Sequence, residues 1–356
     1  MRWRVWIASS IAFLFAAAGA ELLVSSLFGQ SPLLAQAVDV QSSETYFAKL
    51  DLIERHHLRG PTVVVIGDSQ VVGETMADHG DTSWRDHTID RVLERRLIEM
   101  GFQDVLVVNL AANGLLPADL DLIIRDTLSV GVDAIVFNLG LRAFSTDFDT
   151  DAGEFSRPWL KQLCREGRLI ARCGWLGRLA RASALYQVLD FLQHRYLGGA
   201  YRYALANGVE AAFKQRLRPA PSQDDFTNEL ALMVRARSRL GTLSLDPSHR
   251  QVQALKRALE NLREHRARAV AIYSTENRVQ FDQIIDPNVS ARLRTALLGL
   301  VRQYEGETFR VVPPLPELSS SHFLDFMHLN YRGYLILANQ VAPSVADLLR
   351  RPKYGS

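Results

Sequence analysis

The sequence is poor in cysteine, carries almost no excess charge, and has only one long hydrophobic run. Two cysteines among 356 residues are too few for a zinc site of their own or for a disulfide-rich scaffold, and we expect neither a metal nor a cofactor. The formal net charge of +2 differs from the strongly basic balance of a nucleic-acid-binding domain, so no nucleic-acid partner is expected. With 47% hydrophobic and 22% charged residues, the chain has the composition of a folded protein.

The long hydrophobic run lies at the N-terminus. Arg2 and Arg4 precede residues 5–20, which carry no charge, and a second apolar stretch follows Glu21 up to residue 28. Positive residues before an apolar run are typical of an export signal whose positive end stays in the cytoplasm. We expect residues 1–28 to remain as a single membrane-spanning anchor, because about 20 residues cross the hydrocarbon core. The alternative is cleavage at the small residues 18–20, which would release a secreted protein.

In both cases the rest of the chain is expected outside the cytoplasm, in the periplasm or an equivalent space. Cys164 and Cys173 lie close together in sequence, and in an oxidising compartment such a pair can form a disulfide. Spacing alone does not give the geometry of a bridge. Two unlinked buried thiols are therefore the alternative.

Short apolar runs rich in β-branched residues alternate with segments whose apolar residues recur at helical spacing. Uninterrupted apolar strands between helices are typical of a parallel sheet covered on both faces. We therefore predict an α/β protein, a three-layer α/β/α sandwich with a central parallel sheet. The predicted strands are residues 62–66, 105–109, 133–138, 269–273 and 308–312, and the helices between and after them are residues 89–100, 118–128, 289–304 and 331–349.

The alternation is interrupted between the third and fourth strands. Residues 145–268 contain helical patterns only, including one at 251–268, and we interpret them as a large helical insertion that forms a cap or docks a partner. The predicted organisation is an anchor at 1–28, a stalk or linker at 29–60, one α/β domain in two parts at 61–144 and 269–350, and a tail at 351–356.

Polar residues of catalytic type follow several of the predicted strands. Ser69 follows the first strand, Gly114 the second, and Asp325 and His328 the fifth. Because ligands of an open parallel sheet bind beyond the carboxyl ends of its strands, these residues should converge on one edge. A serine, a histidine and an aspartate are the groups that nucleophilic acyl transfer requires.

Each of these residues has a predicted role. A free hydroxyl is a weak nucleophile, so Ser69 can attack an ester carbonyl only if a base, His328, takes its proton. Asp325 would orient the ring and stabilise the imidazolium ion. The backbone N–H groups of Ser69 and Gly114 would bind the anionic oxygen of the tetrahedral intermediate.

These elements resemble the SGNH (GDSL-type) hydrolase superfamily. The resemblance is carried by Gly-Asp-Ser at 67–69, Asn-x-x-x-x-Gly at 109–114 and Asp-x-x-His-Leu-Asn at 325–330, and it covers about residues 60–145 and 268–350. It implies an SGNH-type, flavodoxin-like sandwich in which Ser69 is the nucleophile, Gly114 the oxyanion glycine, and Asp325 and His328 the acid–base pair. Ser69 is not in a Gly-x-Ser-x-Gly elbow, so an ordinary α/β-hydrolase is not indicated.

One position departs from the family's pattern. The family's third block reads Gly-x-Asn-Asp and its Asn donates to the oxyanion, whereas this chain has Arg142 at that position. Arg142 could be a charged donor, Asn138 could substitute for it, or the hole could be incomplete. Arg142 could also bind a carboxylate or phosphate of the substrate, or form a salt bridge at the surface of the cap. Asn113, and Asn277 in a loop similar to one in membrane-anchored members, are further candidates for substrate contact.

The anchor, the insertion and this departure make the chain similar to membrane-anchored SGNH-like proteins that modify cell-envelope polymers, such as the alginate-type O-acetyltransferases. The resemblance implies an O-acetyltransferase or esterase that acts on an envelope polysaccharide through a Ser69 acyl-enzyme. It also implies a polytopic membrane acyltransferase as a partner that supplies the acyl group. The alternatives are a secreted GDSL-type esterase or lipase, and a catalytically impaired SGNH scaffold that binds glycan or a membrane partner.

Overall fold

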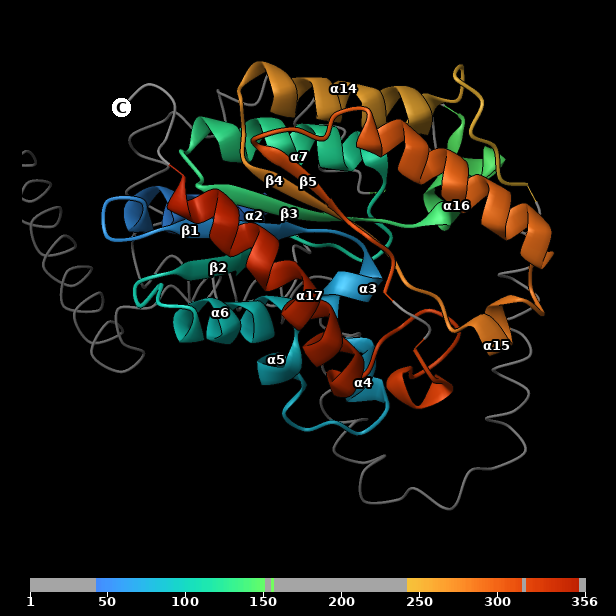
Figure 1. The fold of residues 1–356 in the computed structure, drawn as a ribbon, viewed down its shortest axis with the longest axis horizontal. Coiled ribbons are helices and arrows are strands. Elements are labelled where there is room, and N and C mark those ends of the chain that lie inside the picture. The colour runs from blue at the N-terminus through green and yellow to red at the C-terminus, as the bar shows by residue number, and fades with distance from the viewer. Residues whose placement is uncertain (1–42, 151–154, 157–241, 316–317, 352–356) are drawn as a thin grey trace, which may run out of the picture.

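The computed structural model describes residues 43–150, 155–156, 242–315 and 318–351 (Figure 1). The expected anchor at 1–28 and the expected pairing of Cys164 with Cys173 lie outside these residues. So do most of the predicted insertion and most of the tail. No helix in the described ranges is long and apolar enough to cross a membrane.

A single sheet of five parallel strands forms the centre of the molecule, in the order β2-β1-β3-β4-β5. This confirms the predicted α/β architecture with a parallel sheet between helices. The inner strands are mostly apolar because both of their faces are covered, and every residue of β1 and of β4 is buried. The strands are β1 (Thr62–Ile66), β2 (Leu106–Asn109), β3 (Ala134–Leu139), β4 (Ala269–Tyr273) and β5 (Phe309–Val312).

Long helices cover both faces of the sheet and create two hydrophobic cores (Figure 1). One face is covered by α6 (Ile89–Glu99) and α17 (Tyr331–Arg350), and the other by α2 (Ser43–His56), α7 (Pro117–Ser129), α14 (Arg250–Glu264) and α16 (Pro287–Arg302). Shorter helical turns lie in the loops. They are α3 (Ser69–Val72), α4 (Thr75–Asp78), α5 (Trp84–His87), α15 (Arg278–Phe281), and the 3-10 turns η2 (Leu141–Phe144), η3 (Thr146–Phe148) and η5 (Ser320–His322).

The second half of the predicted linker at 29–60 is a helix, which corrects that prediction. Tyr46, Leu50 and Ile53 of α2 have no exposed surface and belong to the core on the α7 side of the sheet. These residues recur at helical spacing, so they form one apolar stripe that needs a partner surface. Residues 43–56 are therefore part of the α/β domain.

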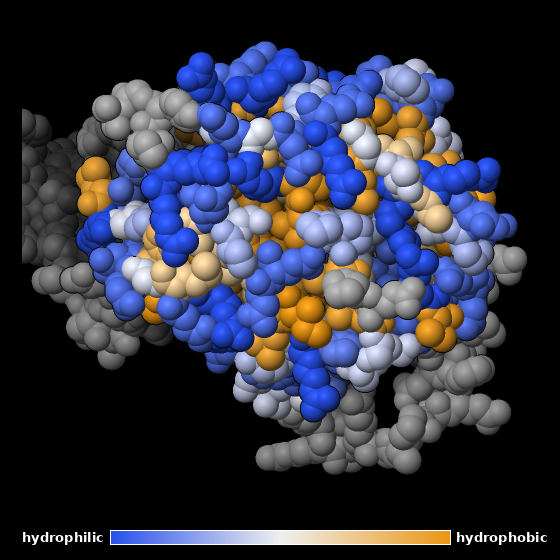
Figure 2. All heavy atoms as spheres, viewed as in Figure 1, coloured by the Kyte–Doolittle hydropathy of each residue, from blue (hydrophilic) through white to orange (hydrophobic). Residues whose placement is uncertain are grey.

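The predicted boundary of the insertion at 268 is also corrected. Residues 250–264 form α14, whose apolar face, including Val252, Leu255 and Leu259, is buried in the same core as α7. Its outer face is hydrophilic, as Figure 2 shows along the top of the view. Thr146 N donates to Thr242 O at 3.0 Å, so these two residues, which are far apart in sequence, lie next to each other in the domain.

The direction in which the chain winds reverses at β1. The connection from β1 to β2 runs through α6 on one face, and the connection from β2 to β3 runs through α7 on the other. In a doubly wound sheet, the loops that follow the two strands at such a reversal run to opposite faces of the sheet. A binding crevice therefore opens at the carboxyl ends of these strands. In Figure 1 this edge is marked by α3, which directly follows β1.

A buried asparagine at this edge generates a stability prediction. Asn109 is 3% exposed, its Nδ2 donates to Asp90 Oδ1 at 3.1 Å, and its Oδ1 accepts from Ala111 N at 2.8 Å. Asn109→Ala should lower the free energy of unfolding by about 1–3 kcal/mol, because a buried carboxylate and a buried N–H lose their partner. Urea denaturation followed by circular dichroism measures the change. Gln103→Ala, at an exposed position, should change it by less than about 0.5 kcal/mol.

Candidate active site

The structure brings Ser69, His328 and Asp325 together in one chain of hydrogen bonds. His328 Nε2 lies 2.9 Å from Ser69 Oγ, and His328 Nδ1 lies 2.7 Å from Asp325 Oδ2. The serine and the histidine are 259 positions apart in sequence. Their contact therefore comes from the fold, as expected for loops that follow parallel strands of one sheet.

Ser69 is the first residue of the short helix α3, directly beyond β1. Asp68 caps this helix, because its side chain accepts from Gln70 N at 3.0 Å. The fully buried Tyr334 of α17 donates its hydroxyl to Gln70 O at 2.6 Å. Burial raises the pKa of Tyr334, so this hydroxyl stays a donor at neutral pH. The nucleophile is thus held from its own loop and from the closing helix.

His328 and Asp325 lie on a narrow loop between η5 and α17. Leu324 N donates to the carbonyl oxygen of His328 at 2.8 Å, and Phe323 pairs with Leu329 as an antiparallel bridge. Asp325 Oδ1 accepts from the backbone N–H groups of Met327 at 2.8 Å and His328 at 2.7 Å. The aspartate therefore both shapes the loop and faces the imidazole that the loop carries.

The electrostatics of the pair suit a general base. Burial raises the pKa of Asp325, but the hydrogen bond and charge of His328 and the two backbone N–H groups outweigh it, so the net pKa lies below its ordinary value. Asp325 is then ionised at neutral pH and can only accept a hydrogen bond. Consequently Nδ1 of His328 carries a proton, and in the neutral ring Nε2 is left to accept the proton of Ser69.

Asn138, at the end of β3, uses its whole side-chain amide to hold the nucleophile's loop. Its Oδ1 accepts from Asp68 N at 3.1 Å, while its Nδ2 donates to Asp68 Oδ1 at 3.0 Å and to Ser274 Oγ at 2.7 Å. A Cβ on Gly67 would lie 2.0 Å from Asn138 Oδ1, so only glycine fits there. Both Nδ2 hydrogens are engaged, and Asn138 therefore has no donor left for an oxyanion.

Gly114 and Arg142 lie next to each other at the same edge. Gly114 adopts a φ of +78°, a conformation that favours glycine, and a Cβ there would lie 3.1 Å from Arg142 Nη2. The Arg142 guanidinium also rests over the ring of Phe148, 5.7 Å from its centre. Within the described part of the chain, Arg142 forms no salt bridge. The salt bridge at the surface of the cap, one of the alternatives for Arg142, is not seen among the described residues, and its half-buried positive charge lies beside Gly114.

Asn277 takes a structural position that the sequence did not indicate. It is 3% exposed, its Oδ1 accepts from Ser320 Oγ at 3.1 Å, and its backbone N donates to Phe326 O at 3.0 Å. The loop after β4 thus supports the loop of His328. The expectation that Asn277 contacts substrate is not supported by this arrangement, since almost none of its surface is accessible.

Behind that loop lies a buried ionisable cluster that the sequence analysis missed. Tyr273 donates its hydroxyl to Glu276 Oε1 at 2.5 Å, and Arg294 Nη2 lies 3.4 Å from Glu276 Oε2. Burial raises the pKa of Glu276, although the charge of Arg294 opposes that shift. Residues 274–277 follow the predicted strand at 269–273, but only the fold reveals that the partners of Glu276 are internal.

Asn113 is the remaining candidate. Its side chain is exposed and its Nδ2 donates to Glu74 Oε2 at 3.2 Å, beside α4. It therefore lies on the rim of the edge and not within the hydrogen-bond chain of Ser69. Among the described residues, no group of three or more His, Cys, Asp or Glu side chains is placed to hold a metal ion.

Comparison with known proteins adds no assignment. No protein-family model matches the chain, and no curated protein matches it. The function must therefore be argued from the geometry of this edge of the sheet.

The lowered pKa of Asp325 predicts a pH-dependent stability. Because this pKa is lower in the folded than in the unfolded state, the carboxylate stabilises the fold above the unfolded value of about 3.9. That contribution is lost as the pH falls through the folded value. The difference in unfolding free energy between the wild type and Asp325→Asn should therefore shrink as the pH is lowered from about 6 to about 3. Urea titrations across this range measure it, and a difference that does not vary with pH would contradict the prediction.

Proposed function

We propose that the protein is a serine acyl-transfer enzyme of the SGNH type, which moves an acyl group between ester oxygens through a Ser69 acyl-enzyme. The observation that carries the proposal is the continuous hydrogen-bond chain from Ser69 Oγ through His328 to Asp325, with distances of 2.9 and 2.7 Å. Such a chain is what a hydroxyl needs to become a nucleophile near neutral pH. It favours an enzyme over the alternative of an impaired scaffold.

The chemistry proceeds in two balanced halves. Ser69 Oγ attacks the ester carbonyl carbon as its proton passes to His328 Nε2, and the carbonyl oxygen becomes an anion. The C–O bond to the alcohol then breaks, and His328 returns the proton to the leaving oxygen. In the second half, His328 takes a proton from water or from a sugar hydroxyl as its oxygen attacks the acyl carbon. The bond from that carbon to Ser69 Oγ then breaks, and His328 returns the proton to Ser69 Oγ.

The anionic oxygen requires donors that are not already used. In the described part of the chain, the backbone N–H groups of Ser69 and Gly114 have no hydrogen-bond partner. Arg142 Nη2 borders Gly114 and its charge is not paired with a carboxylate. Asn138 is excluded as a donor because its amide is committed to Asp68 and Ser274. We assign Arg142 as the third, charged donor of the oxyanion hole.

The finer fold and the biological setting belong to the same proposal. The strand order 2-1-3-4-5 supports a flavodoxin-like sandwich of the SGNH type. The charge pattern of residues 1–28 supports a membrane anchor with the enzyme outside the cytoplasm. With the resemblance described above, this favours an O-acetyltransferase or esterase for an envelope polysaccharide, beside a membrane acyltransferase. A secreted esterase is the alternative, and transfer to an added glycan in preference to water distinguishes the two.

The nucleophile is tested with the full-length chain and p-nitrophenyl acetate. Ser69→Ala should lower kcat by about 10⁴-fold or more, because no other group can form the acyl-enzyme. Ser129→Ala is the matched control and should leave kcat unchanged, since Ser129 ends α7 at the opposite edge of the sheet. Hydrolysis that survives both Ser69→Ala and His328→Ala would contradict the mechanism.

The charged donor is tested with Arg142→Met. Loss of one oxyanion donor should lower kcat by about 10²–10³-fold and change KM little, because the donor acts mainly on the transition state. Arg350→Met is the control, since Arg350 also rests over an aromatic ring, that of Phe102, but at the far end of α17. A rise in KM at constant kcat would instead assign Arg142 to substrate binding.

A further inference from the structure

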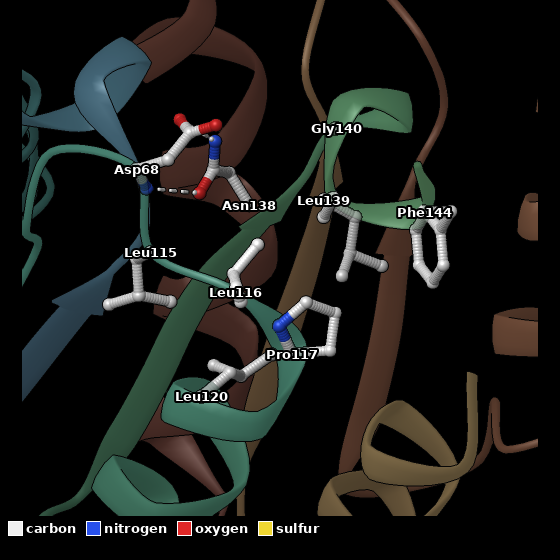
Figure 3. A pocket seen from close by; sticks show the side chains of 10 residues that line it. Asp68, Leu115, Leu116, Pro117, Leu120, Asn138, Leu139, Gly140 and Phe144 are labelled. Atoms are coloured by element: carbon white, nitrogen blue, oxygen red, sulfur yellow. Dashed lines mark hydrogen bonds between the residues drawn. The ribbon is translucent and has the colours of Figure 1, made fainter. Parts of the chain in front are cut away.

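A small hollow lies between segments that border the proposed oxyanion donors. One wall is the start of α7 with Leu115 and Leu120, and the opposite wall is η2 with Ala143 and Phe144. Figure 3 shows Leu115 and Leu120 on one side and Phe144 on the other, with Asp68 and Asn138 above them. Asp68 and Asn138 also line the hollow, so polar and apolar groups share its surface.

The position of the hollow along the chain links it to the reaction. Its lining residue Asp68 directly precedes Ser69, and its lining residue Leu115 directly follows Gly114. The third proposed donor, Arg142, directly precedes the lining residue Ala143. Each donor thus belongs to a segment that also forms a wall of the hollow. In the proposed mechanism this adjacency in sequence places the hollow near the carbonyl group that Ser69 attacks.

The size of the hollow is restrictive. Including its open mouth it encloses about 300 Å³, but its free volume is only about 20 Å³. About 10–15 Å³ of such free volume holds one water molecule, so the hollow takes a group about as large as a methyl. The walls do not yield easily, because Leu120 and Phe144 are each 1% exposed and lie in the main core.

We propose that this hollow is the acyl subsite and that it limits the transferred group to acetyl. The inference rests on the proposed function, because it places the substituent of the carbonyl carbon that Ser69 attacks. The methyl of an acetyl group fills the hollow, and each further methylene has to displace Leu120 or Phe144. The lining also selects against anionic acyl groups, since its one charged side chain, the carboxylate of Asp68, would repel them.

The test is the dependence of kcat/KM on acyl length, measured with the full-length chain and p-nitrophenyl acetate, butyrate and octanoate. For the wild type, kcat/KM should fall by about tenfold or more from acetate to butyrate. Leu120→Ala should raise the butyrate-to-acetate ratio by about tenfold, because it removes the wall that a longer chain meets. Ala143→Val should lower kcat/KM for acetate because the larger side chain narrows the hollow. Unlike Leu120→Ala, this variant removes no side-chain atoms from the core.

Leu122→Ala is the matched control. Leu122 is buried on the same helix, α7, but does not line the hollow. Leu122→Ala should therefore lower stability about as much as Leu120→Ala does, but it should leave the butyrate-to-acetate ratio unchanged. Equal wild-type activity on acetate and octanoate, or an equal shift in both leucine variants, would overturn the acyl subsite and leave the Ser69 mechanism standing. Absence of any Ser69-dependent hydrolysis would overturn both proposals.

Discussion

The geometry of the site depends on one side-chain amide, that of Asn138. Its oxygen and nitrogen fix both the backbone and the carboxylate of Asp68, and its second hydrogen reaches Ser274. These contacts join the segments that follow β1, β3 and β4. The amide can approach so closely only because Gly67 has no Cβ. An amide fits this position because it has an acceptor and two donors in one plane, whereas a carboxylate would repel Asp68.

The nucleophile and its base are held by separate supports. Asp68 and Tyr334 set the position of α3, and with it Ser69. The loop of His328 is set by Asp325 and by Asn277, behind which lies the buried pair of Glu276 and Arg294. A buried ion pair adds little net stability because desolvation offsets its attraction. Its effect here is positional, since Glu276 lies in the segment that holds the histidine loop.

The strands and most of the helices were predictable from the sequence, because burial on both faces and helical spacing leave strong patterns. The predicted strands at 62–66 and 269–273 match β1 and β4 in their bounds. The convergence of Ser69 and His328 followed from the rule for parallel strands. The packing of α2 on the core was missed, although Tyr46, Leu50 and Ile53 mark its stripe. The roles of Asn138 and Asn277 could not be predicted, because spacing does not reveal which partner a side chain selects.

If Arg142 is the oxyanion donor that we propose, its guanidinium, unlike a neutral amide, changes what the rest of the site must do. A permanent positive charge stabilises any nearby anion, including a carboxylate in the ground state, and only stabilisation that grows in the transition state accelerates a reaction. Arg142 therefore contributes most to catalysis when the bound substrate is neutral near it. The hollow that we propose as the acyl subsite meets this condition, because the carboxylate of Asp68 in its lining disfavours a negatively charged acyl group. In this proposal the charged donor and the small subsite together select a neutral, short acyl group.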